Sequence, residues 1–433
     1  MLLVSVTIYS CGNKNTLRGV FQKQTPYEAY SSALKDAKLD ETALGSKWIM
    51  AGEAVFEDTL VITLPFRETA YFDASEVTAN GYRFIAEEGQ IIHVEVDILS
   101  MESLTIFLDL FRLEGSREHV ASSDTSEAVL EFEVKKTGVF MLRLQPELLR
   151  GGRYQLKITS SPALAFPVWG KDSKSIASFF GMDREGGARK HEGVDIFAPR
   201  GTPVLATTKG SIGRVNNNRL GGKVVWMRDS ERNLNYYYAH LDSQMVRSGQ
   251  RVDIGDTLGL VGNTGNAIST PPHLHFGIYQ SGYGAIDPFP YLHNKNTNIT
   301  AEDVGLDYVG NLARIKSPSV NFRLSPNLNS EVIAKLPQHT LLQIAGNSNK
   351  WLRAETADQI KGFVHYTMVE LLESPMYVTA LEDTTTLLNE PDHQGIPLAQ
   401  LRPGASLEVY ASVNDFLYVK YAGDKFGWLP GLN

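Results

Sequence analysis

Four histidines and one aspartate between residues 191 and 275 are the side chains of this sequence best suited to chemistry. His191 and Asp195 lie four residues apart, and His273 and His275 lie two apart. On an extended strand, residues at even spacing share one face, so each pair would point to the same side. Gly193, between the first two, would leave room for an ion. His240 lies between these two pairs in the sequence.

These residue types indicate a metal-centred hydrolytic site. Zinc prefers imidazole and carboxylate ligands, and a catalytic zinc keeps three protein ligands with water in the fourth position. Two histidines and Asp195 would satisfy that requirement. The chain has one cysteine, Cys11, which excludes an internal disulfide and a multi-thiolate site. Packing beside aromatic residues explains any one of the histidines equally well, but four of the chain's ten histidines in this stretch favour a common site.

The segments that carry these residues resemble the signature motifs of the lysostaphin/LytM-type zinc metallopeptidases, which cut peptide bonds in bacterial peptidoglycan. The motifs read HEGVD at 191–195, YAHL at 238–241 and HLHF at 273–276, with GTPV at 201–204 and GNTG at 262–265 in support. The resemblance covers residues 162–293, about a third of the chain. It implies one zinc ion held by His191, Asp195 and His275, with His240 and His273 as catalytic histidines.

The resemblance also implies a mechanism. Zinc polarises the scissile carbonyl and lowers the pKa of its bound water. The site has no His-Glu-x-x-His helix to supply a glutamate, so proton transfer falls to a histidine. His240 and His273 are the available groups, and the sequence leaves open which is the base and which steadies the oxyanion. Two rival functions are a non-catalytic wall-binding regulator of other hydrolases and a zinc peptidase that acts on proteins.

The elements that must position these residues are predicted to be strands. Between residues 202 and 261, short extended segments are broken by glycines with no helix-length period, which indicates an all-β unit. The family resemblance implies that this unit is an antiparallel β-sheet peptidase domain over residues 162–295. Before it, alternating segments at 61–160 predict a β-sandwich of jelly-roll type. A helical region at 21–60 opens with a capping box at Thr25 to Glu28 and continues with a second helix around Trp48.

The first residues resemble a truncated secretory signal that ends in a bacterial lipobox. An apolar run at 1–9 is followed by Ser10, Cys11 and Gly12, and the polar residues after them suit a tether. The resemblance implies lipidation of Cys11 and anchoring in the cell envelope, at the outer membrane or in the periplasm, with residues 1–20 as signal and tether. The alternative is an ordinary N-terminal strand with a buried cysteine.

The C-terminal part is an internal repeat. Residues 305–373 and 374–433 align without a gap at an offset of 65, which pairs Trp351 with Phe416 and Leu336 with Leu401. Each copy resembles a bacterial SH3-like domain, a small β-barrel, and either binds the wall or braces the catalytic domain. A chain of 433 residues is too long for a single hydrophobic core, so several domains are expected. Because most of the predicted elements are strands, the fold class is mainly β and multidomain.

The charge balance limits the partners. The net charge of -8 and a pI near 5.7 offer no basic stripe for a phosphate backbone, so nucleic acid is excluded as a partner. The expected partners are peptidoglycan peptides and, through the lipid anchor, a membrane. Together the motifs predict a lipid-anchored, zinc-dependent peptidoglycan endopeptidase.

Overall fold

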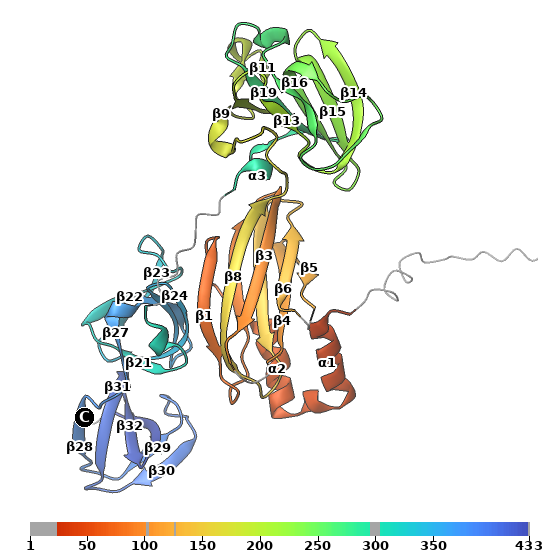
Figure 1. The fold of residues 1–433 in the computed structure, drawn as a ribbon. Coiled ribbons are helices and arrows are strands. Elements are labelled where there is room, and N and C mark those ends of the chain that lie inside the picture. The colour runs from red at the N-terminus through yellow and green to blue at the C-terminus, as the bar shows by residue number, and fades with distance from the viewer. Residues whose placement is uncertain (1–23, 101–103, 125–126, 295–303, 432–433) are drawn as a thin grey trace, which may run out of the picture.

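The computed structural model describes residues 24–100, 104–124, 127–294 and 304–431. Two helices, a β-sandwich, a second β-rich unit and two small β units follow one another along the chain (Figure 1). Cys11 and the rest of the predicted signal lie outside the described residues. Across the described ranges, the helices are too short or too polar to span a bilayer.

The helical region forms as predicted. Helix α1 (Pro26–Asp36) starts with a complete capping box, because the Thr25 hydroxyl accepts from the Glu28 backbone N–H at 3.1 Å and the Glu28 carboxylate accepts from the Thr25 N–H at 2.9 Å. Helix α2 (Ala43–Ala54) carries the buried Trp48, whose indole N–H donates to a backbone carbonyl at the end of the sandwich. The Tyr27 ring of α1 lies 6.2 Å from that of Phe107 in the sandwich, so both helices pack onto the sandwich.

The sandwich confirms the jelly-roll prediction. Its two antiparallel layers have four strands each, in the orders β1-β8-β3-β6, which is part of a larger sheet, and β2-β7-β4-β5, and this is the strand order of a jelly roll. Alternating side chains such as Phe84, Phe140 and Leu156 fill the space between the sheets. The eight strands are β1 (Phe66–Phe72), β2 (Asn80–Ala86), β3 (Gln90–Ile98), β4 (Ile106–Glu114), β5 (Ser116–Ser122), β6 (Val129–Glu133), β7 (Gly138–Pro146) and β8 (Gly152–Pro162).

The central unit is the antiparallel sheet that holds the predicted site residues. Its strands run in the order β17-β14-β15-β16-β19-β12-β9, with β13, β18 and β20 attached, and β10 and β11 form a separate hairpin. A short helix, α3 (Phe289–Leu292), ends the unit. The strands are β9 (Ile176–Ser178), β10 (Asp183–Arg184), β11 (Arg189–Lys190), β12 (Val194–Phe197), β13 (Pro203–Leu205), β14 (Gly210–Asn218), β15 (Gly222–Asp229), β16 (Leu234–Gln244), β17 (Arg251–Val252), β18 (Thr257–Val261), β19 (His273–Gln280) and β20 (Gly284–Ile286).

The C-terminal strands repeat with the predicted period. Strands β24 and β31 are offset by 65 residues at both ends, as are β21 and β28. Among the described strands, the hydrogen-bonded path of each copy does not return to its first strand, so the expected small barrels are open. The main strands are β21 (Leu312–Ile315), β22 (Ser319–Arg323), β23 (Val332–Pro337), β24 (Leu341–Ser348), β25 (Trp351–Thr356), β26 (Lys361–His365) and β27 (Val369–Leu371) in the first copy, and β28 (Tyr377–Ala380), β29 (Thr385–Leu388), β30 (Pro397–Leu401), β31 (Ser406–Val413), β32 (Phe416–Ala422) and β33 (Lys425–Pro430) in the second.

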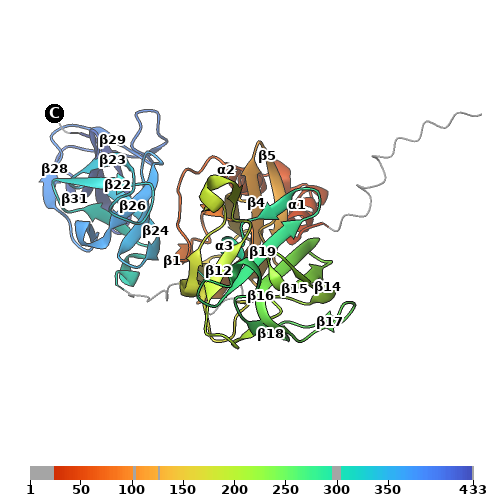
Figure 2. The same ribbon diagram turned by 90° about the horizontal axis from the view of Figure 1, so that it is seen from above.

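Direct contacts join the units. Strand β24 of the first repeat pairs with β1 of the sandwich, with Thr69 opposite Asn347, so both belong to one 11-stranded sheet. The central unit contacts the sandwich through an ion pair of 2.9 Å between Arg232 and Glu133. Seen from above, the central unit lies over the sandwich and both repeats lie to one side (Figure 2). The sandwich therefore connects the candidate site to the repeats.

Candidate metal-centred active site

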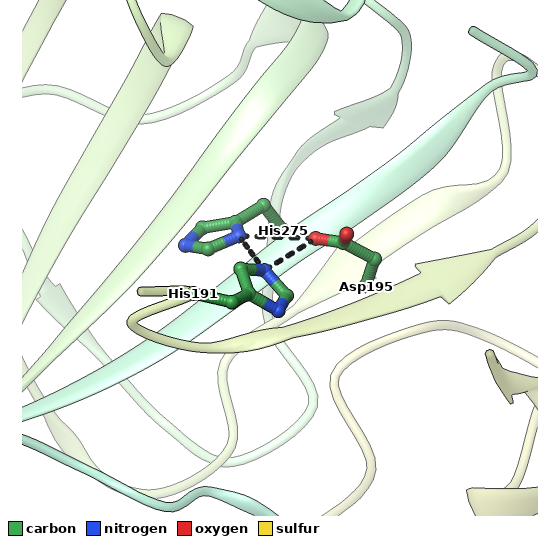
Figure 3. Close-up of side chains that lie close together, drawn as sticks. All are labelled: His191, Asp195 and His275. Atoms are coloured by element: carbon green, nitrogen blue, oxygen red, sulfur yellow. Dashed lines mark hydrogen bonds and ion pairs between the residues drawn. The ribbon is translucent and has the colours of Figure 1, made fainter. Parts of the chain in front are cut away.

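Three of the predicted residues form a compact triangle. His191 Nε2, Asp195 Oδ1 and His275 Nδ1 are each 3.0 Å from the other two (Figure 3). Strands β12 and β19 pair with Asp195 directly opposite His275, which places these two side chains together. His191 comes from the segment before β12, which begins at Val194. The expectation that His191 and Asp195 share a strand face was therefore wrong, although the two side chains do converge.

Gly193 has a different part from the one expected of it. A Cβ at this position would lie 2.8 Å from His275 Cε1 and 2.5 Å from the Phe276 carbonyl oxygen. The absent side chain therefore makes room for the imidazole of His275 and for strand β19, rather than for an ion. The sequence could not show this, because the contact depends on how β12 and β19 align.

The position of the ring proton on His191 leaves two acceptor atoms of the triangle facing each other. His191 Nδ1 lies 2.8 Å from the Phe179 carbonyl oxygen, which can only accept, so Nδ1 carries the proton. In the neutral ring the lone pair is then on Nε2, directed at the Asp195 carboxylate. Burial lowers the pKa of His275, which favours the neutral imidazole that binds metals.

The donor set fits a divalent metal ion. Within the described part of the chain, the histidine and carboxylate side chains that lie close enough together to hold a metal ion are those of these three residues. Their ligand atoms all lie within 4.8 Å of one another. Ligands of a tetrahedral zinc with bonds of 2.0–2.2 Å are about 3.3–3.6 Å apart, so the triangle needs to open only slightly. Two imidazoles and one carboxylate match the ligands of catalytic zinc sites.

His240 and His273 lie beside the triangle. Their rings are 5.0 Å apart, and His273 Nε2 is 4.0 Å from Asp195 Oδ1. Each ring uses Nδ1 on a backbone carbonyl, that of Thr264 for His240 and that of Pro271 for His273, both at 2.9 Å. Because a carbonyl accepts, both Nδ1 atoms donate, and the Nε2 atoms remain available to a bound molecule. Burial lowers the pKa of His240 to about 4.

The backbone of His240 is unusual. Its φ of 63° lies in the left-handed region, which non-glycine residues rarely adopt. The register of β15 and β16 shifts at this point, and the His240 N–H donates to the Gly221 carbonyl at 2.7 Å. The strand alternation is interrupted there, and the imidazole enters the pocket beside His273. Strain of this kind is held in place by surrounding structure and clusters at functional sites.

A pocket of about 480 Å³ contains all of these groups. Trp226, Tyr237 and Tyr279 form an aromatic wall, with the Trp226 ring 4.5 Å from Tyr237 and 5.1 Å from Tyr279. We did not predict this wall, although Tyr237 alternates with the buried Tyr236 and Tyr238 and so had to face the other side of β16. The five predicted site residues line the pocket together: His191, Asp195, His240, His273 and His275.

Arg184 is a further residue of the site that we did not predict. Its Nη2 donates to Asp195 Oδ2 at 2.6 Å, and the side chain lines the same pocket. Arg184 belongs to the β10–β11 hairpin, which is not part of the main sheet. Its spacing from the motif residues carries no periodic signal, so only the folded arrangement shows that it reaches the site.

Two family models match this chain. Peptidase family M23 matches residues 189–288, and a bacterial SH3 domain matches residues 316–370. The first range contains all five predicted site residues. The second lies within the first C-terminal repeat.

Curated proteins match part of this chain. The L-Ala--D-Glu endopeptidase of Bacillus subtilis (strain 168) is 38% identical over 139 residues, which are 30% of this chain and 42% of that protein. The glycyl-glycine endopeptidase ALE-1 of Staphylococcus capitis is 32% identical over 154 residues, 34% of this chain and 41% of that protein. The uncharacterized lipoprotein YgeR of Escherichia coli (strain K12) is 36% identical over 126 residues, 29% and 46% respectively. The chain thus spans less than half the length of these relatives.

Among solved structures, the catalytic domain of lysostaphin from Staphylococcus simulans is 30% identical. The alignment covers 28% of this chain and 93% of that chain, with a TM-score of 0.25. The matched part is again confined to a fraction of the molecule.

Proposed function

Because residues 189–288 form a peptidase family M23 domain and residues 316–370 a bacterial SH3 domain, we propose that this protein is a zinc-dependent endopeptidase that hydrolyses peptide bonds of bacterial peptidoglycan. The observation that carries the proposal is the triangle of His191, Asp195 and His275, with His240 and His273 in the same pocket. Two relatives named peptidoglycan DD-endopeptidases support the choice of substrate.

In this proposal His191, Asp195 and His275 hold the metal ion. When bound, zinc supplies a Lewis acid that polarises a carbonyl oxygen and makes water a stronger nucleophile. His240 and His273 do the proton transfers. Each neutral ring keeps its Nδ1 proton on a backbone carbonyl, so Nε2 can accept a proton from water and then donate it to the leaving amine. A protonated Nε2 can also stabilise the oxyanion by a hydrogen bond.

The rival, a non-catalytic regulator that binds the wall, is less well supported. A binding module needs the pocket but not two imidazoles held by their Nδ1 atoms beside a metal triangle. All five site residues are present and line one pocket. A catalytic function gives each of the five residues a role, whereas a non-catalytic regulator gives His240 and His273 none.

We place the enzyme in the cell envelope, anchored by a lipid on Cys11. The support is the lipobox-like sequence around Cys11 and the lipoprotein name of one relative. Stable anchoring takes more than one acyl chain, because a single chain holds only weakly. If Cys11 carries the anchor, Cys11→Ser should move the protein from the membrane fraction to the soluble fraction. Wild-type protein that is wholly soluble in a cell extract would contradict the anchor.

The decisive experiment is digestion of defined muropeptides by the purified protein, with products identified by mass. We expect peptide-bond cleavage that a chelator abolishes and added zinc restores, and that His275→Ala eliminates. Zinc-loaded wild-type protein that binds peptidoglycan but yields no cleaved peptide would overturn the proposal in favour of the regulator. Cleavage that survives both the chelator and His275→Ala would show that the activity lies elsewhere.

A further inference from the structure

The two oxygens of Asp195 have different partners. Oδ1 belongs to the triangle, 3.0 Å from His191 Nε2 and 3.0 Å from His275 Nδ1. Oδ2 accepts a hydrogen bond of 2.6 Å from Arg184 Nη2. The Asp195 side chain is only 10% exposed, so the contact is largely shielded from water. One oxygen thus faces the proposed metal and the other is held by a cation.

The guanidinium of Arg184 also contacts Ser178, a residue that lies beside His191. Arg184 Nη2 donates to the hydroxyl of Ser178, and that hydroxyl lies 3.3 Å from His191 Nδ1. Strand β9, which carries Ser178, pairs with β12 next to Asp195. Arg184 therefore connects two of the three residues of the triangle through direct and hydroxyl-mediated contacts.

We propose that Arg184 is a positioning residue that makes Asp195 a one-oxygen ligand. The inference rests on the proposed zinc site. A carboxylate can bind a metal through one oxygen or both, and a charge-assisted hydrogen bond on Oδ2 holds that oxygen away from the ion. The metal then keeps three protein ligand atoms and an open position for water, as catalytic zinc requires.

The arginine also orients the ligand. The hydrogen bond on Oδ2 fixes the Asp195 carboxylate with Oδ1 directed at His191 and His275, the arrangement in which it can bind the metal. Partners of this outer layer orient a ligand and tune the ion, and their loss usually weakens metal binding by roughly tenfold to a hundredfold.

A purely structural role for Arg184 makes a different prediction. The hairpin has its own ion pair, Lys190 to Asp183 at 2.6 Å, and both side chains are about two-thirds exposed. If Arg184 merely fixed the hairpin or added positive charge near the site, removing Lys190 would have a similar effect. Lys190→Ala is therefore the matched control, because it removes one cation from the same hairpin and leaves the Arg184 contact in place.

The test measures metal binding rather than turnover. Zinc affinity of the full-length wild type, Arg184→Ala, Arg184→Lys and Lys190→Ala is measured by competition with a chromophoric chelator, and coordination by the visible spectrum after cobalt(II) substitution. Four-coordinate cobalt(II) absorbs more strongly than five- or six-coordinate cobalt(II). We expect Arg184→Ala to bind zinc roughly tenfold to a hundredfold more weakly, with weaker cobalt bands. Arg184→Lys should recover most of the spectrum, and Lys190→Ala should match the wild type.

Two sets of results distinguish a failure of the positioning role from a failure of the proposed function. Unchanged or tighter zinc binding by Arg184→Ala, with an unchanged cobalt spectrum, overturns the positioning role and leaves the zinc site standing. Wild-type protein that binds neither metal, or binding that His275→Ala does not reduce, overturns the proposed function itself. If Arg184→Ala does not fold, Arg184→Met keeps a long side chain in the hairpin without a hydrogen-bond donor, and the same two readouts apply: binding and a spectrum equal to the wild type would overturn the role.

Discussion

Two buried polar clusters in this molecule have opposite hydrogen-bond balances. At the junction of the sandwich and the first repeat, Arg353 donates to both oxygens of Glu68, at 2.8 and 3.0 Å, and to Asn80 at 3.0 Å. At the candidate site, the Nε2 lone pair of His191 faces the oxygen of Asp195. In the first cluster the arginine donors match the acceptors around them. The second cluster brings acceptor atoms together, an arrangement that a cation would stabilise.

The balanced cluster is an interdomain brace. Glu68 is fully buried on β1 and its partner Arg353, 285 residues away in the sequence, lies on β25. The hydroxyl of Tyr82 also donates to Glu68. A Cβ on Gly346 would lie 2.5 Å from Glu68 Oε1, so the glycine allows β24 to approach the carboxylate. The cluster fixes two domains rather than a ligand.

The two repeats differ at this point. The residue 65 positions after Arg353 is Tyr418, whose ring stacks 5.3 Å from Phe426 and lies 5.0 Å from Trp428. The second repeat thus has an aromatic residue where the first has the buried cation. The contacts of Arg353 and of β24 join the first copy to the sandwich, so wall binding and bracing of the catalytic domain, the two roles considered for the repeats, both stay predictions.

The largest effects should follow from breaking the unbalanced cluster. His275→Ala, and likewise His191→Ala or Asp195→Ala, should lose bound zinc and all measurable cleavage, because a catalytic zinc has three protein ligands. The melting temperature should also fall if the ion holds β12 and β19 together. Metal analysis beside a muropeptide assay checks this. Stoichiometric zinc in His275→Ala would show that the ligand set is wrong.

The next largest effect should leave the metal in place. His273→Ala and His240→Ala should keep near-stoichiometric zinc and a wild-type melting temperature. Their turnover should drop by roughly two to four orders of magnitude, the usual contribution of positioned proton transfer. The same two assays decide the matter. If His273→Ala loses zinc while His275→Ala retains it, the two histidines of β19 have exchanged roles.

The predictable part of this molecule depends on local pattern. The capping box at Thr25, the alternation that builds the sandwich and the repeat with period 65 are written in neighbouring residues, and the structure has all three. The convergence of the five site residues was also expected, from the motifs they resemble. Leu274 points into the core between His273 and His275, as strand alternation requires.

The unpredicted part depends on the placement of distant segments. The turn of His240 into the left-handed region follows from the register shift in β16, and the contact of Gly193 follows from the alignment of β12 with β19. The reach of Arg184 depends on how its hairpin folds over the sheet. The pairing of β1 with β24 joins residues far apart in the chain, and no sequence period reports it.

A third prediction breaks the balanced cluster. Arg353→Met leaves the Glu68 carboxylate buried without its partner, so it should destabilise the protein by about 3–5 kcal/mol in denaturant unfolding. Adding Glu68→Leu should restore most of that loss, because the pair is then replaced by apolar side chains. Zinc content should not change in either variant. An Arg353→Met effect no larger than that of Lys157→Met, which breaks an exposed pair with Glu95 in the same sheet, would rule out the brace.

The smallest effects should come from the glycine that each cluster needs. In Gly193→Ala the new methyl group would meet the Phe276 carbonyl and the His275 ring, so the cost of overpacking, about 1–3 kcal/mol, should be accompanied by weaker zinc binding. In Gly346→Ala the methyl group meets the Glu68 carboxylate instead, so a similar loss of stability should leave zinc binding at the wild-type level. Unfolding curves and chelator competition on both variants test the contrast. Equal zinc affinity in the two variants would mean that Gly193 does not position His275, and that the two glycines differ only in location.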